Sequence, residues 1–257
     1  MKEISFKNLS VGPYSEDVLK KHWNIASGKG MEFCEIVSLE GENVLQINYP
    51  KGEVGKGPLW NYKFEKPVDE YMLEYKVRVP NDFDFVRGGK LPGLYGGSGP
   101  AGGASVAEAD GFSARIMWRE LGVLCQYVYY MDKDPESHWG KNYLWMKGLN
   151  KNMPITRDMW KTMNEYFNDR VYIVPGKWHT LKTYIKMNTL GKEDGKIVSW
   201  CDGEEVVNVN LRFRNDLSFG IDRFKFTTFF GGNEETWAPT KDEKMYFKDF
   251  RLHSEKF

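Results

Sequence analysis

The stretch Tyr71-Met-Leu-Glu-Tyr-Lys-Val-Arg-Val79 decides the fold class, because its apolar and polar residues alternate strictly. Leu73 and Val77 fall on one face of an extended chain, and Glu74 and Arg78 fall on the other. This period of two is typical of an antiparallel strand with one buried and one solvated face. The stretch therefore predicts a sheet that packs on a second layer.

The same pattern recurs on both sides of this stretch. Further strands are predicted at 112–120, 122–131, 178–187, 196–201, 204–210, 222–230 and 244–252. Asp202-Gly203 between two of them is a two-residue hairpin signal, since a type I′ turn needs positive φ at both positions. Short helices are expected only at 15–22 and 156–168. We therefore predict an all-β protein with a single domain over 1–257. The expected architecture is two packed, curved antiparallel sheets, either a sandwich or a jelly roll.

Composition excludes several classes of protein. The 257 residues include 36 Lys and Arg and 36 Asp and Glu, so the formal net charge is zero. A dedicated nucleic-acid binder carries a surplus of Lys and Arg, so no nucleic-acid partner is expected. No apolar run approaches the roughly 20 residues that span a bilayer, so no membrane association is expected. We expect a monomer. The polar N-terminus lacks a signal-peptide pattern, which leaves open a mature secreted form or a protein that works without a signal.

The cysteines and histidines suggest no metal site. Cys34, Cys125 and Cys201 are far apart and odd in number, which fits neither a disulfide framework nor metal-ligand spacing. They are expected to be small buried residues. The four histidines share no metal spacing either, and His138 alone follows the candidate site closely enough to enter it. No metal and no cofactor are expected.

The first stretch with chemical character is a hairpin at 111–130, turning at Glu120-Leu121-Gly122. A three-residue turn pairs position i with position 242 − i. Arg115 then lies opposite Tyr127, and Ser113 lies opposite Tyr129. Alternation places all four side chains on one face of the sheet.

The second stretch is the glycine-rich segment 87–103, which contains Gly88-Gly-Lys90-Leu-Pro-Gly. It is expected to be a loop whose backbone approaches a ligand closely, with the Lys90 ammonium free. It is not a phosphate loop, because no Ser or Thr follows the lysine and no helical pattern comes after it.

Together these residues suit proton abstraction next to a carboxylate. A cation neutralises the carboxylate so that the adjacent C–H becomes acidic, and Lys90 and Arg115 are expected to do this. A tyrosine then moves the proton, provided that nearby cations lower its pKa. This chemistry is β-elimination on a uronic-acid polymer. The plain alternative is a Tyr/Arg ladder on a solvated sheet.

The motifs Gly88-Gly-Lys90-Leu-Pro-Gly-Leu-Tyr95, Ser113-x-Arg115 and Tyr127-x-Tyr129 resemble polysaccharide lyase family 14. The resemblance covers roughly residues 60–255. It implies an alginate or polyglucuronate lyase of β-jelly-roll fold without a redox cofactor, acting on an acidic polysaccharide in its concave cleft. It also implies a catalytic group made up of Lys90, Ser113, Arg115, Tyr127 and Tyr129.

Arg87, Tyr95 and Arg119 are expected to bind substrate, Tyr95 and Arg87 by loop position and Arg119 by strand parity. Lys90, Tyr127 and Tyr129 are expected to line a wet groove, so that substituting them barely affects folding. In this scheme Ser113 orients the tyrosine that moves the proton, and sequence leaves open which tyrosine that is.

Two other functions compete with the lyase. One is a non-catalytic, lectin-like jelly roll that binds acidic polysaccharides through stacked aromatic rings. The other is a glucanase, which needs two carboxylates that flank the scissile bond. Its usual Glu-x-Asp-x-x-Glu pattern is matched only by Glu108-x-Asp110, and Ser113 stands in place of the second Glu. A hydrolase is therefore disfavoured.

Overall fold

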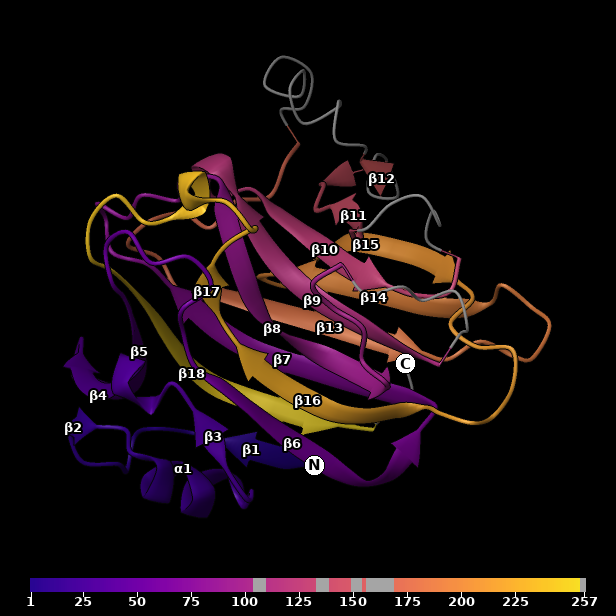
Figure 1. Ribbon diagram of the computed structural model, residues 1–257, viewed down its shortest axis with the longest axis horizontal. Helices are drawn as coiled ribbons and strands as arrows, with labels where there is room; N and C mark the ends of the chain where they lie inside the picture. The colour runs from indigo at the N-terminus through magenta and orange to yellow at the C-terminus, as the bar shows by residue number, and fades with distance from the viewer. Residues whose placement is uncertain (104–109, 133–138, 149–153, 156–168, 255–257) are drawn as a thin grey trace.

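The computed structural model describes residues 1–103, 110–132, 139–148, 154–155 and 169–254 (Figure 1). These residues form two antiparallel sheets of nine strands each. The predicted helix at 156–168 and the residue His138 lie outside the described residues. No helix of the described part is both long enough and apolar enough to span a membrane.

Sheet A has the strand order β15-β14-β13-β7-β18-β5-β4-β2, with β1 beside β18. Its strands are β1 (Lys2–Ile4), β2 (Gly12–Pro13), β4 (Cys34–Leu39), β5 (Glu42–Tyr49), β7 (Glu70–Arg78), β13 (His179–Lys186), β14 (Gly195–Cys201), β15 (Glu204–Leu211) and β18 (Glu243–His253).

Sheet B has the order β12-β11-β10-β9-β8-β16-β6-β3, with β17 beside β8. Its strands are β3 (Gly28–Lys29), β6 (Leu59–Val68), β8 (Gly88–Gly97), β9 (Gly111–Arg119), β10 (Leu124–Tyr129), β11 (Lys141–Leu144), β12 (Pro154–Ile155), β16 (Ile221–Thr227) and β17 (Phe229–Phe230).

Helical structure in the described part is scarce. The predicted helix at 15–22 is confirmed as α1 (Glu16–Trp23), in which the Ser15 side chain accepts a hydrogen bond from the Val18 N–H. Leu19 and Trp23 bury the inner face of α1 against the sandwich. The remaining turns of helix are short 3₁₀ segments, η1 (Met31–Phe33), η2 (Glu120–Gly122) and η5 (Glu235–Trp237).

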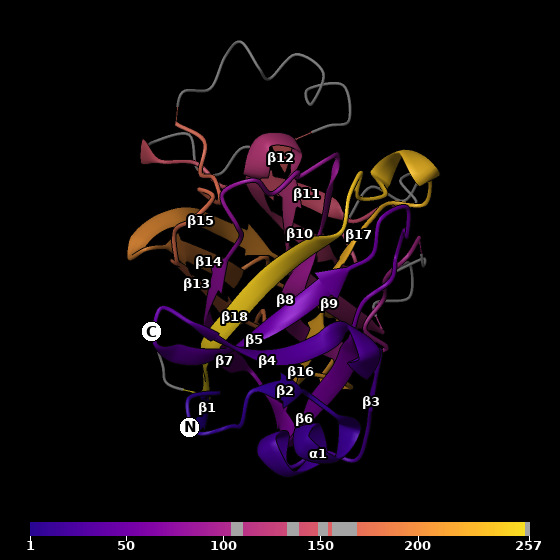
Figure 2. The ribbon, with the colours of Figure 1, turned by 90° about the vertical axis from the view of Figure 1, so that its left-hand side faces the viewer.

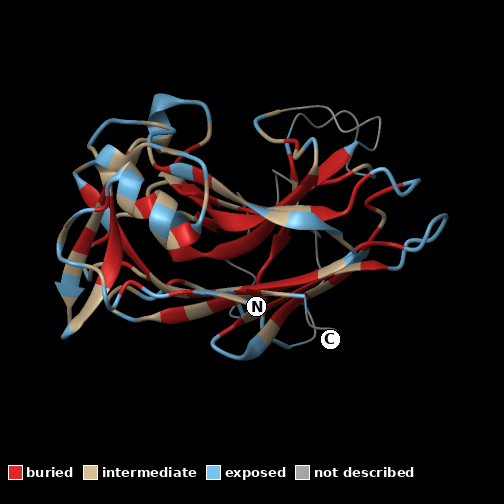
Figure 3. Ribbon diagram, turned by 90° about the horizontal axis from the view of Figure 1, so that it is seen from below, coloured by how far each residue is buried: buried red, intermediate tan, exposed pale blue. Residues whose placement is uncertain are grey.

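The core lies between the two sheets, which face each other in Figure 2. Aromatic side chains fill it: the rings of Trp60 and Phe226 stack with centroids 3.9 Å apart, and Phe226 meets Phe247 of sheet A at 5.2 Å. Buried stretches run through both layers, and the exposed ones gather in connecting loops (Figure 3). The large aromatic content of the sequence therefore serves mainly to join the layers.

The predicted all-β jelly-roll fold is confirmed. The alternating stretch 71–79 becomes β7, with Tyr75 fully buried and Glu74 partly exposed. The turn at Asp202-Gly203 has φ values of 52° and 88°, as a type I′ hairpin requires. Cys34, Cys125 and Cys201 are buried free thiols, as expected.

The prediction of a glycine-rich loop at 87–103 is wrong for most of its length, because residues 88–97 form β8. This strand lies in the middle of sheet B, between β9 and β16. The glycines serve close packing: a Cβ at Gly89 would lie 2.2 Å from the Trp118 ring, and one at Gly93 would lie 2.1 Å from the Ala114 carbonyl. A run of glycines in a sequence usually indicates a loop. Here the glycines lie in a strand whose neighbours leave no room for a Cβ atom.

Candidate active site

The hairpin formed by β9 and β10 has the predicted register. Arg115 pairs with Tyr127, and Ser113 pairs with Tyr129. The turn is tight because Leu121 and Gly122 both adopt positive φ, 61° and 82°. Side chains of the opposite parity, such as Trp118, lie in the core. The four predicted residues therefore share the face of sheet B that points away from sheet A, called the site face below.

A bulge in β8 brings Lys90 to the same face. Lys90 pairs with Met117 and Gly93 pairs with Arg115, so Leu91 and Pro92 together oppose one residue of β9. Without this extra residue, strand alternation would put Lys90 and Tyr95 on opposite faces. The Lys90 ammonium lies 4.9 Å from the centre of the Tyr127 ring, and the Arg115 guanidinium lies 5.8 Å from it. Two cations therefore converge on one tyrosine.

The expectation of a wet groove is wrong for these side chains. Lys90, Arg115 and Tyr127 keep 9%, 5% and 5% of their surface exposed, and Ser113 and Tyr129 keep none. The Lys90 ammonium is not free either, since it donates a hydrogen bond to the Gly231 carbonyl at 3.2 Å. These long side chains cover one another and so exclude water. The alternation of residues along a strand predicts which face a side chain lies on, but not whether its neighbours cover it.

The two tyrosines form a hydrogen-bonded pair. Their hydroxyl oxygens lie 3.1 Å apart, and the rings meet edge to face at 89°. Each hydroxyl also accepts a backbone N–H: Tyr127 from Gly140 at 3.0 Å, and Tyr129 from Gly103 at 3.1 Å. Because Tyr129 is fully buried, Tyr127 is the member of the pair that a bound molecule can touch.

Ser113 acts at a distance from the tyrosine hydroxyls. Its hydroxyl donates to the Pro100 carbonyl at 2.6 Å. This bond ties β9 to the segment that carries Gly103, whose N–H holds the Tyr129 hydroxyl. Ser113 therefore supports the tyrosine pair through the backbone segment from Pro100 to Gly103.

Burial separates the pKa values of Lys90 and Tyr127. Burial lowers the pKa of Lys90 well below its usual 10.5, and the neighbouring charges of Arg119 and Arg115 lower it further. Burial, together with Tyr129, raises the pKa of Tyr127 above its usual 10.0. The expectation that nearby cations lower the pKa of Tyr127 is therefore wrong, because loss of hydration outweighs them.

The three predicted substrate-binding residues lie at different places on sheet B. Arg87 forms an ion pair with Glu234 at 3.3 Å and lies over the Trp237 ring at 5.0 Å. Arg119 lies over the same ring at 5.8 Å and donates to Asn142 at 2.5 Å. Tyr95 is fully buried in β8, where it pairs with Ser113. Arg87 and Arg119 thus share Trp237 as an aromatic neighbour.

Sequence reasoning also missed two cations on β16. Arg223 and Lys225 alternate with the core residues Phe224 and Phe226, so they belong to the site face. Both lie over the Tyr95 ring, at 5.7 Å and 4.4 Å. The predicted strand at 222–230 already contained this alternation, which was the available signal.

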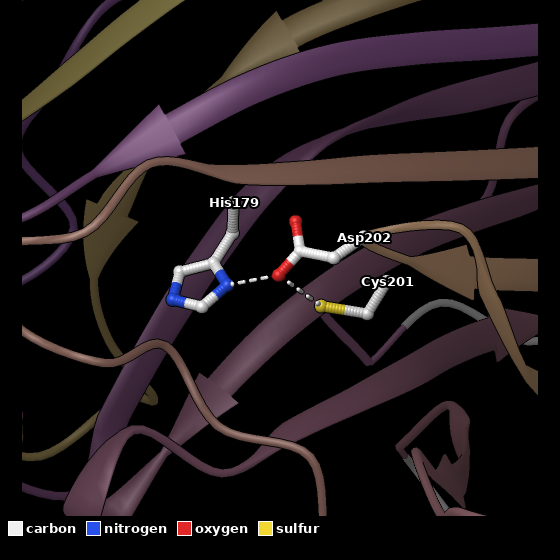
Figure 4. Close-up of side chains that lie close together, drawn as sticks. All are labelled: His179, Cys201 and Asp202. Carbon is white, nitrogen blue, oxygen red and sulfur yellow. Dashed lines mark hydrogen bonds and ion pairs between the residues drawn. The ribbon is translucent and has the colours of Figure 1, made fainter.

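A cluster of potential metal ligands lies in sheet A, away from the site face (Figure 4). His179, Cys201 and Asp202 place one ligand atom each within 4.8 Å of one another. The fold already uses these groups. His179 Nδ1 lies 2.7 Å from Asp202 Oδ2, and its Nε2 accepts the Val174 N–H at 2.9 Å, while Asp202 Oδ1 accepts the Thr180 N–H at 2.7 Å. We interpret the cluster as a lock on the hairpin between β14 and β15.

The fold and the cluster of Lys, Arg and two tyrosines on one face are what the resemblance to a polysaccharide lyase family predicts. The family model of polysaccharide lyase 14 matches residues 38–250, and the chain belongs to this family.

Individual relatives agree with this assignment. The crystal structure of the alginate lyase from Aplysia kurodai is 26% identical, with a TM-score of 0.74 over 99% of this chain and 98% of that chain. The fold is also that of alginate lyase Aly36B, at 22% identity and a TM-score of 0.79 over 99% and 97% of the two chains. Exolysin of Paramecium bursaria Chlorella virus 1 is 25% identical over 209 residues. That match covers 77% of this chain and spans 31% of the length of the viral protein.

Proposed function

We propose that this chain cleaves a uronic-acid polymer, such as alginate or polyglucuronate, by β-elimination. The observation that carries the proposal is the convergence of Lys90 and Arg115 on Tyr127. Among the described residues, neither cation forms an ion pair with a carboxylate. An anion that enters this site gains from the positive charge of the Arg115 guanidinium, and a uronate carboxylate is such an anion.

The separated pKa values suggest which group moves which proton. An environment that pushes two titratable groups apart in pKa marks one as base and the other as acid. Lys90, with its lowered pKa, is the proposed base that takes the proton from C5. Tyr127, with its raised pKa, keeps its hydroxyl proton and is the proposed acid that gives it to O4.

The proposed step balances as follows. The electron pair of the C5–H bond forms the C4=C5 double bond, and the C4–O4 bond breaks. Lys90 becomes an ammonium and Tyr127 a phenolate, and a proton that passes from one to the other restores the site. The Arg115 guanidinium stabilises the negative charge that develops on the carboxylate. Tyr129 and Ser113 are then positioning residues behind Tyr127.

The lectin-like alternative fits the geometry less well. Binding of a sugar by stacking needs an aromatic ring with an open face. Tyr127 is 5% exposed and Tyr129 is fully buried, and the two rings contact each other edge to face. The pair is built to hold its hydroxyl groups in place and presents little ring surface.

The test is incubation with sodium alginate and, separately, with polyglucuronate. We expect oligosaccharides with a C4=C5 double bond at the new end, seen as rising ultraviolet absorbance. Reducing ends that appear without this absorbance would show hydrolysis. Binding of the polymer without new ends would favour the lectin-like alternative.

A further inference from the structure

Besides Lys90 and Arg115, a third cation without a carboxylate partner among the described residues lies on the site face, two strands away from Arg115. Lys225 of β16 pairs with Gly93 of β8, and Gly93 pairs with Arg115 of β9. The position between the two cations is thus a glycine, which has no side chain to separate them. Neighbouring strands lie about 4.8 Å apart, so the backbones of Lys225 and Arg115 are about 10 Å apart.

Lys225 is held in place without an opposite charge. Its ammonium lies 4.4 Å from the centre of the Tyr95 ring, and it forms no ion pair within the described chain. Its neighbour Arg223, by contrast, is paired with Asp222 at 2.5 Å. Partial burial, Arg223 and Arg115 lower the pKa of Lys225 to about 8. Partial burial without a carboxylate partner costs this cation part of its hydration.

Buried polar atoms without partners surround the same spot. The Tyr95 hydroxyl, the Asn61 side-chain oxygen and the Arg115 Nε are all covered, and none has a hydrogen-bond partner among the described residues. Asn61 pairs directly with Lys225 across β6 and β16. Unpaired buried polar groups are rare in native proteins, and an absent ligand is one explanation for them.

The chemistry of these atoms indicates an acidic sugar. Lys225 and the Arg115 guanidinium are donors suited to carboxylate oxygens. The Asn61 oxygen is an acceptor suited to a sugar hydroxyl. We propose that Lys225, which lies over the buried Tyr95 ring, and Asn61 form a second uronate subsite, which holds the residue next to the one that is cleaved. This inference rests on the proposed lyase function and adds that the enzyme reads two neighbouring carboxylates.

Lys225→Met tests the subsite, because it keeps an unbranched chain over the Tyr95 ring and deletes the charge. We expect KM for the polymer to rise about tenfold or more, the typical cost of losing a charged hydrogen bond. The variant's kcat should stay within about twofold, since the charge contacts a residue that does not react. The dependence of KM on salt should also weaken, because one screened charge is gone. Lys225→Arg, which keeps the charge, should recover most of the affinity.

Lys182→Met is the matched control. Lys182 also lies over an aromatic ring, 4.9 Å from the centre of Trp200, but it belongs to β13 on the outer face of sheet A. It should leave KM, kcat and the salt dependence unchanged.

The outcomes separate the two proposals. Wild-type protein that forms no unsaturated ends overturns the lyase function itself. Active wild-type protein together with an unchanged KM and salt dependence in Lys225→Met overturns only the second subsite. If Lys225→Met shows reduced kcat with unchanged KM, Lys225 acts on the reacting residue and the subsite is likewise wrong.

Discussion

The outward-facing sides of the two sheets differ in how some of their cations are paired. On sheet A, Lys76 pairs with Asp249 at 2.9 Å, and Arg251 pairs with Glu74 at 3.3 Å. On the site face of sheet B, Lys90 and Lys225 form no ion pair among the described residues. Both faces are built from the same alternation, so the difference lies in the partners that the sequence supplies. A paired face serves solubility and stability, and an unpaired one is available to an anion that arrives from outside.

This difference predicts that substitutions on the two faces affect different properties of the protein. Changes on the site face should reduce turnover, even where they stabilise the fold. Changes on sheet A should reduce stability and leave turnover unaltered. The predictions below test this separation, from the largest expected effect to the smallest.

Tyr127→Phe should have the largest effect. It deletes the proposed acid and keeps the ring, so kcat should fall by about 10²–10⁴, the usual contribution of a general acid or base. Stability should fall as well, by about 1–3 kcal/mol, because the Gly140 N–H loses its acceptor in a buried place. Tyr129→Phe should cost less turnover, because Tyr129 acts only through Tyr127. Initial rates of ultraviolet absorbance and thermal unfolding measure both effects.

Tyr143→Phe is the control for the tyrosine pair. Tyr143 also shares a hydrogen bond between hydroxyls, with Tyr130 at 3.1 Å, but both belong to the core side of the sheet. This variant should lose stability and keep its turnover. If it lost turnover as Tyr127→Phe does, or if Tyr127→Phe kept full turnover, the proposed separation of the faces would be wrong.

In this site, the sequence alone predicts the pairing of β9 with β10 but not the position of Lys90. The register of β9 and β10 follows from the length of one turn, so Ser113, Arg115, Tyr127 and Tyr129 could be assigned to one face. The position of Lys90 could not be derived from alternation, because a bulge at Leu91–Pro92 shifts the parity of β8.

The burial of the site side chains also could not be predicted from the sequence. Side chains that alternate toward the outside of a sheet are expected in water, yet these cover one another and lie beneath Gly103 and Gly140. Desolvation then reverses the pKa shift expected for Tyr127. Pairing along a strand is a local property that sequence carries. Desolvation depends on segments that are distant in the chain, such as the one that supplies Gly231 to Lys90.

Lys90→Met should abolish most turnover, by about 10²-fold or more, and should remove a penalty on folding near neutral pH, a gain that the lost hydrogen bond to the Gly231 carbonyl partly offsets. The gain follows from the lowered pKa: the unfolded chain binds a proton at this lysine more tightly than the folded chain does. This penalty on folding is complete below the lowered pKa and disappears as the pH rises past 10.5. The advantage of Lys90→Met should therefore shrink toward alkaline pH. Chemical denaturation at several pH values measures it.

Two comparisons decide the role of Lys90. Lys76→Met, the same change on the paired face, should keep turnover and lose at most about 1 kcal/mol. Lys90→Arg keeps a charge but cannot accept a proton. It should therefore be as inactive as Lys90→Met if Lys90 is the base. High turnover in Lys90→Arg would instead assign Lys90 to neutralising the carboxylate. For the wild type, turnover should rise with pH through the lowered pKa of Lys90.

Asp202→Asn should have the smallest effect, confined to stability. Asp202 holds the β14–β15 hairpin by accepting from Thr180 and pairing with His179 (Figure 4). Asparagine tolerates the same positive φ of 52° and keeps one oxygen, so one hydrogen bond of the lock is lost. We expect a loss of about 0.5–1.5 kcal/mol and unchanged turnover.

A chelator should leave the melting temperature of the wild type unchanged, because the side chains of this cluster already form hydrogen bonds with one another and with the backbone. A fall in melting temperature with chelator would show instead that a metal ion occupies the cluster, and a fall in turnover of Asp202→Asn would show that the paired face supports catalysis after all.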